Sequence, residues 1–440
     1  MKLKTTLLII LSLTFRLGYA QENIIELPLT PEIGYGPFRM ALKGVSANNE
    51  DKENPWLDTY LKISKLPQGL AEIKQGSIDA YMYQSVYQDY LQGNITKEWY
   101  EQLQKSWGWI PDTLQLSKTP LKTKVAFAYG KDKDGNLKLV IDANNNLDLS
   151  DDALLTPLEM TAENNGKKEL LAQTHGVKVS LETFANGQIV PVTVPLFMMY
   201  NDQYRTFLCN FSQYATTEYE GRRIAVVSNT FTELSYQRLE LAFVDCELKA
   251  GEKIGDNNIY RKNEYIEIRN QIYQIAGVNT NKNTLVLRKI EQPKEQLQST
   301  QVGYKAHSFQ GNNFKSQDLI TSESLKGKYV LLDFWAIWCG PCLQEMPHLK
   351  ELYDKVDRSK IEFIGIVGDS QPAQLTQMMD KYAITWPQIL SDDANGIKEK
   401  FGIKSYPTTF LLDEQGVIIA KNMWGEELEK MLLNLAKDTF

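Results

Sequence analysis

The sequence predicts an α/β domain in the C-terminal third of the chain, preceded by a helical segment and a β-rich region of antiparallel strands. Three observations carry this prediction. After residue 301, apolar strand patterns alternate with helical patterns, which is typical of an α/β fold. Between residues 119 and 290, short apolar runs recur between turn residues, which favours antiparallel sheets. Before residue 119, aromatic residues recur at helical spacing, which favours helices.

Composition limits the classes of protein to consider. The 440 residues allow two or three domains, each with its own core. Hydrophobic residues make up 42% and charged residues 23%, as in ordinary globular proteins. The formal net charge is -7 and there is no long basic run, so we expect no nucleic-acid partner.

Residues 1–20 read as a signal peptide. Lys2 and Lys4 precede an apolar run at residues 7–15, and residues 18–20 end in a small-x-small pattern, as signal peptidase requires. The run is shorter than the roughly 20 apolar residues of a membrane span. We therefore predict an exported, periplasmic protein that is soluble after cleavage; the alternative is an uncleaved N-terminal anchor.

Residues 21–118 form an aromatic-rich and partly helical region. One predicted helix ends at Gly93, and a second begins at Thr96 and ends at Pro111. Its aromatic residues would form either a small helical core or a binding platform, and their helical spacing favours the core. They are Tyr81, Tyr83, Tyr87, Tyr90, Trp99, Tyr100, Trp107 and Trp109.

Residues 119–290 form the predicted β-rich domain. Strands at 125–129 and 137–141 flank Asp134-Gly135, a strong hairpin signal. Further strands are expected at 177–183, 189–200, 204–211, 223–227, 238–245, 265–268, 272–278 and 285–290. Residues 291–300 contain few apolar side chains and are the predicted linker.

Residues 301–440 form the predicted α/β domain. Strands are expected at 329–335 and 361–367, helices at 346–356 and 374–382, a hairpin at 408–412 and 417–422, and a last helix at 426–437.

Cys339-Gly340-Pro341-Cys342 allows three interpretations. A zinc site needs further ligands, but the chain has three histidines and no second Cys-x-x-Cys. A structural disulfide across so short a loop would constrain little of the unfolded chain. A redox couple remains. A strand leads to Cys339 and a helix begins there, so helix N-terminal N–H groups favour its thiolate.

The same placement assigns roles to the two thiols. Pro341 suits a first helical turn because it has no N–H to satisfy. Cys342, one turn along, is placed to attack a mixed disulfide. We therefore expect Cys339 to be the nucleophile and Cys342 the resolving thiol.

Residues 333–342 (DFWAIWCGPC), a helix containing Pro347, and Tyr406-Pro407-Thr408 resemble the thioredoxin superfamily. The resemblance covers residues 301–440. The predicted export, the lead-in at 306–309 and an extra strand and helix before Pro407 are similar to the TlpA/ResA branch. Members of that branch are extracytoplasmic thiol-disulfide oxidoreductases that pass electrons to protein disulfides, often during cytochrome c maturation.

The resemblance implies roles for several residues. Pro407 matches the cis-proline beside the cysteine pair, and Asp333 matches a buried acid that relays a proton; the alternative for Asp333 is a surface carboxylate. Glu345 matches a helix acid that tunes the thiol pKa, or is an ordinary exposed glutamate. Trp335 and Trp338 match aromatics under and beside the disulfide. The implied substrate contacts are Trp338, Gly340, Pro341, Tyr406 and Thr408.

The Gly-Pro between the cysteines departs from ResA-like proteins and matches thioredoxin, whose potential of about -270 mV is reducing. We therefore expect an enzyme that reduces protein disulfides and is recharged by a membrane electron donor or thiol-disulfide transporter. The alternative is a ligand- or partner-binding protein that uses residues 21–300, with the thioredoxin-like domain as redox sensor.

Two weaker signals lie in the β-rich region. Asp142, Asn144, Asn146 and Asp148 are spaced like calcium ligands, but Leu147 replaces the usual glycine, so an Asx-rich turn is the alternative. Cys209 and Cys246 would form either a cross-strand disulfide or two buried thiols. We expect no cofactor beyond the Cys339–Cys342 disulfide, with calcium as the weak alternative.

Overall fold

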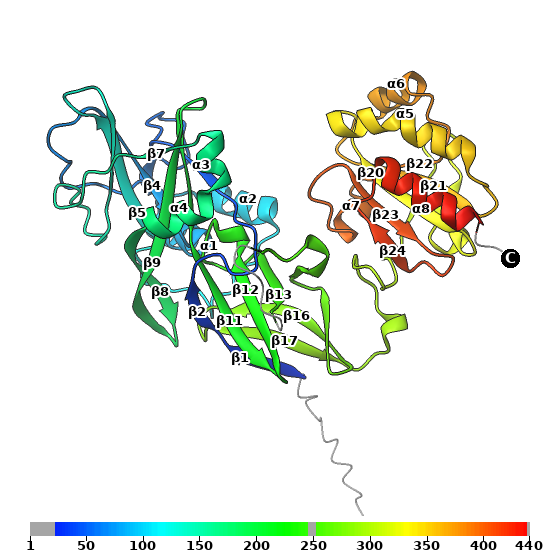
Figure 1. Cartoon of the computed structure of the whole chain (residues 1–440), viewed down its shortest axis with the longest axis horizontal. Coiled ribbons are helices and arrows are strands. Elements are labelled where there is room, and N and C mark those ends of the chain that lie inside the picture. Colours follow the sequence, from blue (N-terminus) through cyan, green and yellow to red (C-terminus); the bar gives the residue numbers. More distant parts are fainter. Residues whose placement is uncertain (1–22, 245–251, 438–440) are drawn as a thin grey trace, which may run out of the picture. The chain divides into compact units, whose positions relative to one another are not determined.

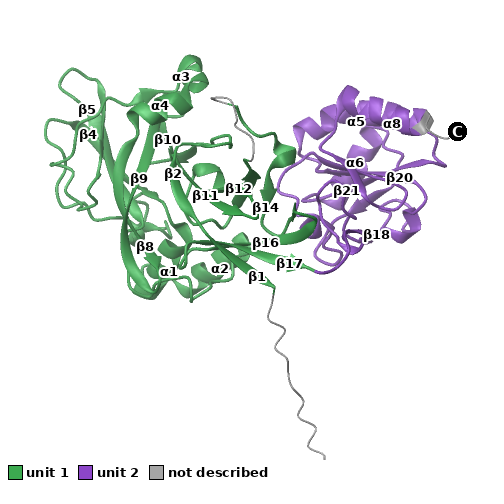
Figure 2. Cartoon of the chain, turned by 60° about the horizontal axis from the view of Figure 1, so that its bottom comes forward, with its two compact units in different colours: residues 1–290 green, residues 291–440 purple. Residues whose placement is uncertain are grey.

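The computed structural model describes residues 23–244 and 252–437. The predicted signal peptide, residues 1–20, therefore lies outside the described residues. The chain divides into two units, residues 1–290 and residues 291–440 (Figure 2), and residues 291–300 belong to the second. No helix within the described ranges is long and apolar enough to cross a membrane.

The described part of the first unit contains four sheets (Figure 1). The first has the order β1 (Ile24–Pro28), β17 (Thr284–Ile290), β16 (Gln271–Asn279), β15 (Tyr265–Ile268). The second is β14 (Tyr260–Arg261), β13 (Leu239–Phe243), β12 (Arg222–Ser228), β11 (Gln213–Tyr219), β2 (Thr30–Ile33). The third is β3 (Lys43–Val45), β10 (Thr206–Phe211), β9 (Gln188–Asn201), β7 (Leu158–Glu159), with β8 (Val177–Ala185) also on β9. The fourth is β4 (Ala71–Asp79), β5 (Lys124–Lys131), β6 (Leu137–Ile141).

These sheets confirm that the region is rich in antiparallel strands. Among the pairs within them, β7 and β9 run parallel and the others antiparallel. β4 pairs with β5, so a ladder joins residues on either side of position 118, where the sequence suggested a change of region. Such long-range pairing has no local sequence signal.

The described part of this unit also contains four α-helices: α1 (Met82–Gln92), α2 (Lys97–Trp107), α3 (Ala162–Gly166) and α4 (Lys168–His175). The Thr96 side chain caps α2 by accepting a hydrogen bond from the Trp99 N–H. α2 ends four residues before Pro111, because Gly108 adopts a left-handed conformation that terminates it. Val86, Tyr87, Tyr100 and Trp109 are buried between these two helices and the segment that follows.

A five-stranded mixed sheet forms the centre of the second unit. Its order is β22 (Gln388–Leu390), β21 (Ile361–Val367), β20 (Tyr329–Trp335), β23 (Thr408–Leu412), β24 (Ile418–Lys421), and a separate small sheet pairs β18 (Gln310–Asn312) with β19 (Leu319–Thr321). The helices are α5 (Gly340–Lys355), α6 (Pro372–Lys381), α7 (Ile397–Lys400) and α8 (Gly425–Lys437). β20, β21 and β22 run parallel to one another, β23 is antiparallel to β20, and β24 is antiparallel to β23. The predicted α/β domain is confirmed, although α5 begins at Gly340 rather than 346, because the helix continues through Pro347.

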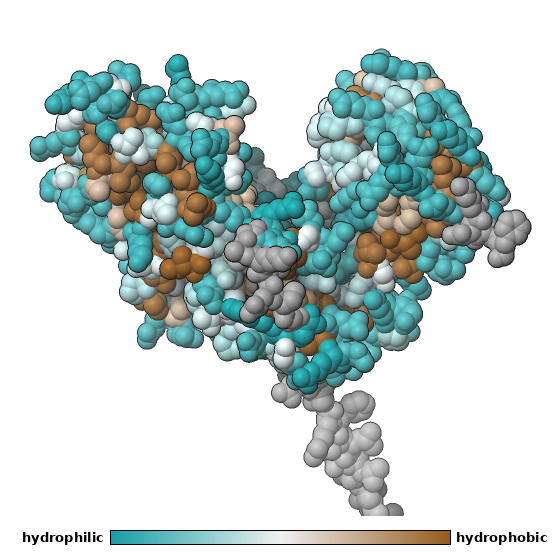
Figure 3. Space-filling view, in the orientation of Figure 1, coloured by the Kyte–Doolittle hydropathy of each residue, from teal (hydrophilic) through white to brown (hydrophobic). Residues whose placement is uncertain are grey.

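β20 divides the core of this unit into two faces. Leu331 and Trp335 belong to the cluster that includes buried residues of α5, α6 and α8, whereas Leu332 and Phe334 belong to the cluster on the other face. Since side chains alternate along a strand, Asp333 points to the same face as Leu331 and Trp335. The pleat therefore directs an acid toward the layer that holds both cysteines. Outside these cores, the visible surface is mostly hydrophilic, with apolar patches on each unit (Figure 3).

One buried hydrogen bond in the sheet can be tested by mutation. Trp335 and Trp386 are both fully buried; Trp335 Nε1 donates to Gln388 Oε1 at 2.9 Å, whereas Trp386 Nε1 has no partner within the described ranges. Trp335→Phe strands the Gln388 acceptor and should lower the free energy of unfolding by about 1–3 kcal/mol more than the control Trp386→Phe. Urea unfolding measures the difference in the free energy of unfolding, and hydrogen exchange in β20 shows whether the loss is local to the strand. Equal losses in both variants would contradict the prediction.

Candidate active site

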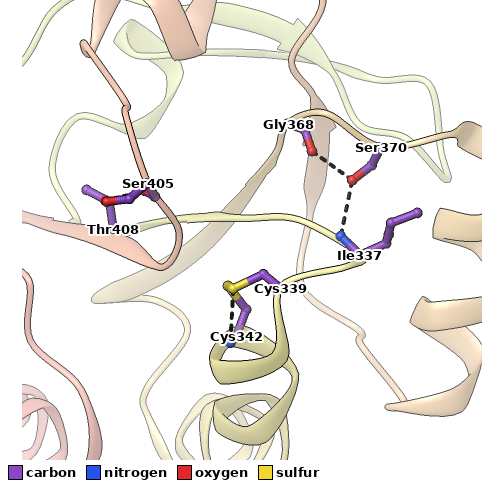
Figure 4. Close-up of a disulfide and its surroundings, with 7 residues drawn as sticks. All are labelled: Ile337, Cys339, Cys342, Gly368, Ser370, Ser405 and Thr408. Carbon is purple, nitrogen blue, oxygen red and sulfur yellow. Dashed lines mark hydrogen bonds between the residues drawn. A yellow bond between two sulfur atoms is a disulfide. The ribbon is translucent and has the colours of Figure 1, made fainter. Parts of the chain in front are cut away.

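The cysteine pair lies where β20 gives way to α5. Cys339 is the N-cap of the helix, and its Sγ accepts a hydrogen bond from the Cys342 N–H at 3.2 Å (Figure 4). A disulfide joins the two residues, and both are buried. Pro341 occupies the first turn. The helix N-terminus thus surrounds Cys339 with partial positive charge, which favours its thiolate in the reduced state.

A second segment approaches the pair from β23. The Tyr406–Pro407 peptide bond is cis. Thr408 lies opposite Phe334 in the ladder between β23 and β20, so Pro407 falls level with the end of β20. The Tyr406 ring contacts the Trp338 ring edge-to-face, with centroids 5.8 Å apart. The cis-proline segment therefore adjoins the cysteine loop.

The residues predicted to contact substrate share this rim. Trp338 is 64% exposed, and Gly340 and Pro341 are exposed beside it. Tyr406 and Thr408 are half-buried. The two segments form a continuous accessible surface around the buried sulfurs.

Asp333 is a buried acid. The residue is only 4% exposed, and its Oδ2 atom has no hydrogen-bond partner in the described part of the chain. It is therefore not the surface carboxylate that was the alternative. Burial, reinforced by the nearby negative charge of Glu345, raises the pKa of Asp333 to about 7. Such a group exchanges protons near neutral pH.

Glu345 is held on α5 by two contacts. Its Oε1 accepts a hydrogen bond from the Gly425 N–H, at the start of α8, at 2.9 Å, and lies 2.8 Å from His348 Nδ1. The Glu345 side chain is 22% exposed, so it is not an ordinary surface glutamate. These contacts fix the carboxylate whose charge acts on Asp333.

His348 is a member of this site that the sequence did not identify. Its Nε2 lies 3.6 Å from Glu429 on α8. Burial alone would lower the pKa of His348, but hydrogen bonds and charge from Glu345 and Glu429 raise it. The i, i+3 spacing of Glu345 and His348 on a helix was an available signal.

The loop after β21 also reaches the cysteine segment. Ser370 Oγ accepts a hydrogen bond from the Ile337 N–H at 3.1 Å and donates to the Gly368 carbonyl at 2.7 Å (Figure 4). No sequence pattern indicated this contact, which holds the backbone two residues before Cys339.

The candidate calcium loop makes hydrogen bonds within itself. Asp142 and Asn144 side chains accept from the Asn146 N–H, and the Asn146 side chain accepts from the Asp148 N–H, as in an Asx-rich turn. In the described ranges, no three His, Cys, Asp or Glu side chains are grouped as a metal site.

The second pair of cysteines is only partly described. Cys209 is a buried free thiol on β10, and burial raises its pKa to about 11. Cys246 lies outside the described residues. The Cys209 thiol is thus unreactive in comparison with Cys339, whose surroundings favour ionisation.

The sheet order, the capped Cys-Gly-Pro-Cys turn and the cis-proline define a thioredoxin-like dithiol domain. Comparison with known proteins agrees. The AhpC/TSA family matches residues 302–421. Thiol-disulfide oxidoreductase ResA of Bacillus thuringiensis (strain Al Hakam) is 31% identical over 132 residues, which are 30% of this chain and 75% of that protein. Thioredoxin-like protein YneN of Bacillus subtilis (strain 168) is 41% identical over 100 residues, 22% of this chain and 56% of that protein.

Among solved structures, the thioredoxin domain of a thiol-disulfide oxidoreductase from Bacteroides vulgatus is 26% identical, with a TM-score of 0.29, and the match covers 31% of this chain and 97% of that one. Through its C-terminal region, the chain belongs to the family of ResA-like thiol-disulfide oxidoreductases. The family match lies within the second unit, and the relatives named here each cover less than a third of the chain.

The buried acid predicts a dependence of stability on pH. The pKa of Asp333 is 3.8 in its ordinary state and about 7 in the folded chain. Because folding raises this pKa, the protonated Asp333 contributes on the order of 4 kcal/mol to the free energy of unfolding below pH 4. This contribution is lost as the pH rises to 7. Asp333→Asn should therefore become more stable relative to wild type across this window.

Urea unfolding of the oxidised chain at pH 4 to 8, with hydrogen exchange in β20, measures the difference. Asp357→Asn is the control, because Ser359 holds the pKa of that exposed carboxyl below its ordinary value, which leaves its charge unchanged in this range. A difference between wild type and Asp333→Asn that stays constant with pH would contradict the assignment.

Proposed function

We propose that this chain is an exported reductase of protein disulfides that acts through the Cys339–Cys342 dithiol. The observation that carries the proposal is the cysteine pair at the N-terminus of α5, with Asp333 buried on the sheet face that α5 covers. The apolar run at residues 7–15 supports export. The Gly-Pro dipeptide supports the reducing direction.

The proposed reaction begins with the reduced chain. The Cys339 thiolate attacks one sulfur of a client disulfide; the client S–S bond breaks, and the departing client thiolate takes a proton from solvent. Cys342 then gives its proton to the Asp333 carboxylate and attacks Cys339 Sγ. The mixed disulfide breaks, and the second client thiolate leaves and is protonated. Two electrons and two protons reach the client, and the chain ends with its own disulfide.

Asp333 and Glu345 divide the proton handling in this scheme. A carboxyl with a pKa of about 7 is present in both protonation states at neutral pH, so it can accept the Cys342 proton and later release it. Burial keeps the pKa of Asp333 high, and the charge of Glu345 raises it further. The contacts of Glu345 with Gly425 and His348 hold its carboxylate in place. Asp333→Asn should slow the second step and spare the first.

The oxidised chain must be reduced again. A membrane electron donor or thiol-disulfide transporter would do this through the same cysteine pair and the rim formed by Trp338 and Tyr406. The resemblance to the ResA branch supports proteins with exported cysteine pairs as clients, apocytochrome c among them.

A cavity in the first unit favours a second candidate function, ligand or partner binding by residues 21–300. The cavity has a volume of about 760 Å³ and is lined by α1, the segment after α2, the β8–β9 hairpin and β16. Tyr81, Trp109, Val192 and Tyr236 are among its lining residues, and such mixed aromatic and apolar walls suit an organic ligand. In this function the thioredoxin-like domain would report redox state.

Cysteine variants separate these functions. Cys342→Ser should accumulate a mixed disulfide between Cys339 and a protein disulfide such as insulin, because the resolving thiol is missing, while Cys339→Ser should form none. In both variants, the rate at which insulin is reduced with dithiothreitol as electron source should fall to the uncatalysed rate. Mass spectrometry and the insulin precipitation assay measure these outcomes, with Cys209→Ser as the active control.

The reduction potential provides an independent check. A value near -270 mV for the Cys339–Cys342 couple, as in thioredoxin, agrees with a reductase. A value near -120 mV, as in strongly oxidising DsbA, would overturn the reducing direction. Normal insulin turnover by Cys339→Ser would overturn the catalytic assignment.

A further inference from the structure

Asp369 lies in the loop after β21 and contacts both segments of the active-site rim. Its backbone carbonyl accepts a hydrogen bond from Trp338 Nε1 at 3.0 Å. Its carboxylate accepts from the Tyr406 hydroxyl at 3.0 Å and from Lys398 Nζ at 2.6 Å. One residue thus links the cysteine loop, the cis-proline segment and α7.

The loop around Asp369 is itself tightly placed. The Gly368 N–H donates to the Trp335 carbonyl, and Ser370 bridges Gly368 and Ile337 (Figure 4). A side chain at Gly368 would collide with the Tyr406 hydroxyl, 1.9 Å from the position of its Cβ. The Tyr406 hydroxyl therefore packs directly on the loop backbone.

This arrangement is poorly explained by stability alone. Asp369 has a φ of 47°, a left-handed conformation that is uncommon for a residue other than glycine. Its side chain is 48% exposed, and an ion pair as exposed as the one with Lys398 contributes little to stability. The conformation does, however, place the carbonyl on Trp338 and the carboxylate on Tyr406 at the same time.

We propose that Asp369 is a positioning residue that holds Trp338 and Tyr406 as a preformed aromatic surface for the polypeptide flanking a client disulfide. This rests on the proposed reductase function. The two rings already meet edge-to-face, and Trp338 is largely exposed, so apolar side chains beside the client cysteines can pack on them. Fixing the rings in advance lowers the entropy lost on binding. A small disulfide has no flanking residues and gains nothing from this surface.

The test compares a protein disulfide with a small one. Asp369→Ala removes both carboxylate contacts, and it should raise KM for insulin roughly tenfold while leaving kcat unchanged, because binding and not thiol chemistry is affected. The rate with bis(2-hydroxyethyl) disulfide, a small disulfide without aromatic rings, should stay within about twofold of wild type. Asp369→Asn keeps an acceptor for the Tyr406 hydroxyl and should restore most of the loss, whereas Lys398→Met tests the ion pair alone.

A second readout does not depend on turnover. The ¹⁵N relaxation of the Trp338 indole should show a more mobile ring in Asp369→Ala than in wild type or Asp369→Asn. Three results would each overturn the positioning role. They are an equal loss of reduction rate with both disulfides in Asp369→Ala, an unchanged KM for insulin, and a Trp338 ring that is as ordered in Asp369→Ala as in wild type. If wild type reduces neither disulfide, the reductase function fails, and the indole measurement still decides the positioning role.

Discussion

The packing of α5 against one face of β20 is the constraint on which the site depends. It brings the N-terminus of a helix to the end of a buried strand, so Cys339 receives hydrogen-bond donors and partial positive charge from the helix. The same face carries Asp333, which is buried and has no partner for Oδ2 among the described residues. A thiol whose ionised form is favoured and an acid whose neutral form is favoured are therefore set into one layer.

Two groups of contacts hold the parts around this layer. On the α8 side, Glu345 joins the Gly425 N–H and His348, which places a negative charge where it acts on Asp333. On the β21 side, Asp369 and Ser370 hold Trp338, Tyr406 and Ile337. In the proposed reaction, the first group serves proton transfer and the second shapes the surface that a client would meet. The hydrogen bonds of both groups are made to neighbouring residues and not to the cysteine sulfurs, so each group acts by fixing the position of a neighbour.

Sequence patterns predicted the second unit well and the first unit only in outline. β20, β21 and β23 have the predicted bounds, because each is a mainly apolar run between polar or turn residues. For α5, the helical pattern was placed at 346–356, whereas the helix begins at Gly340, directly after Cys339, and runs through Pro347. In the first unit, the hairpin of β5 and β6 follows from Asp134-Gly135, but the ladder between β4 and β5 joins strands separated by two helices. Its pairing depends on packing that no short pattern records.

By itself, the sequence determined the α/β order of the last third, the cysteine pair and its likeness to thioredoxin, because periodicity and spacing are local properties of the chain. Only the tertiary structure decided that Asp333 is buried without a partner for Oδ2, that Glu345 contacts a residue 80 positions away, and that Asp369 joins residues 31 and 37 positions from it. These contacts exist because the sheet brings distant segments to one edge. A carboxylate on a strand or loop has the same local sequence whether it ends in water or in the core, so its surroundings and its pKa follow from the fold alone.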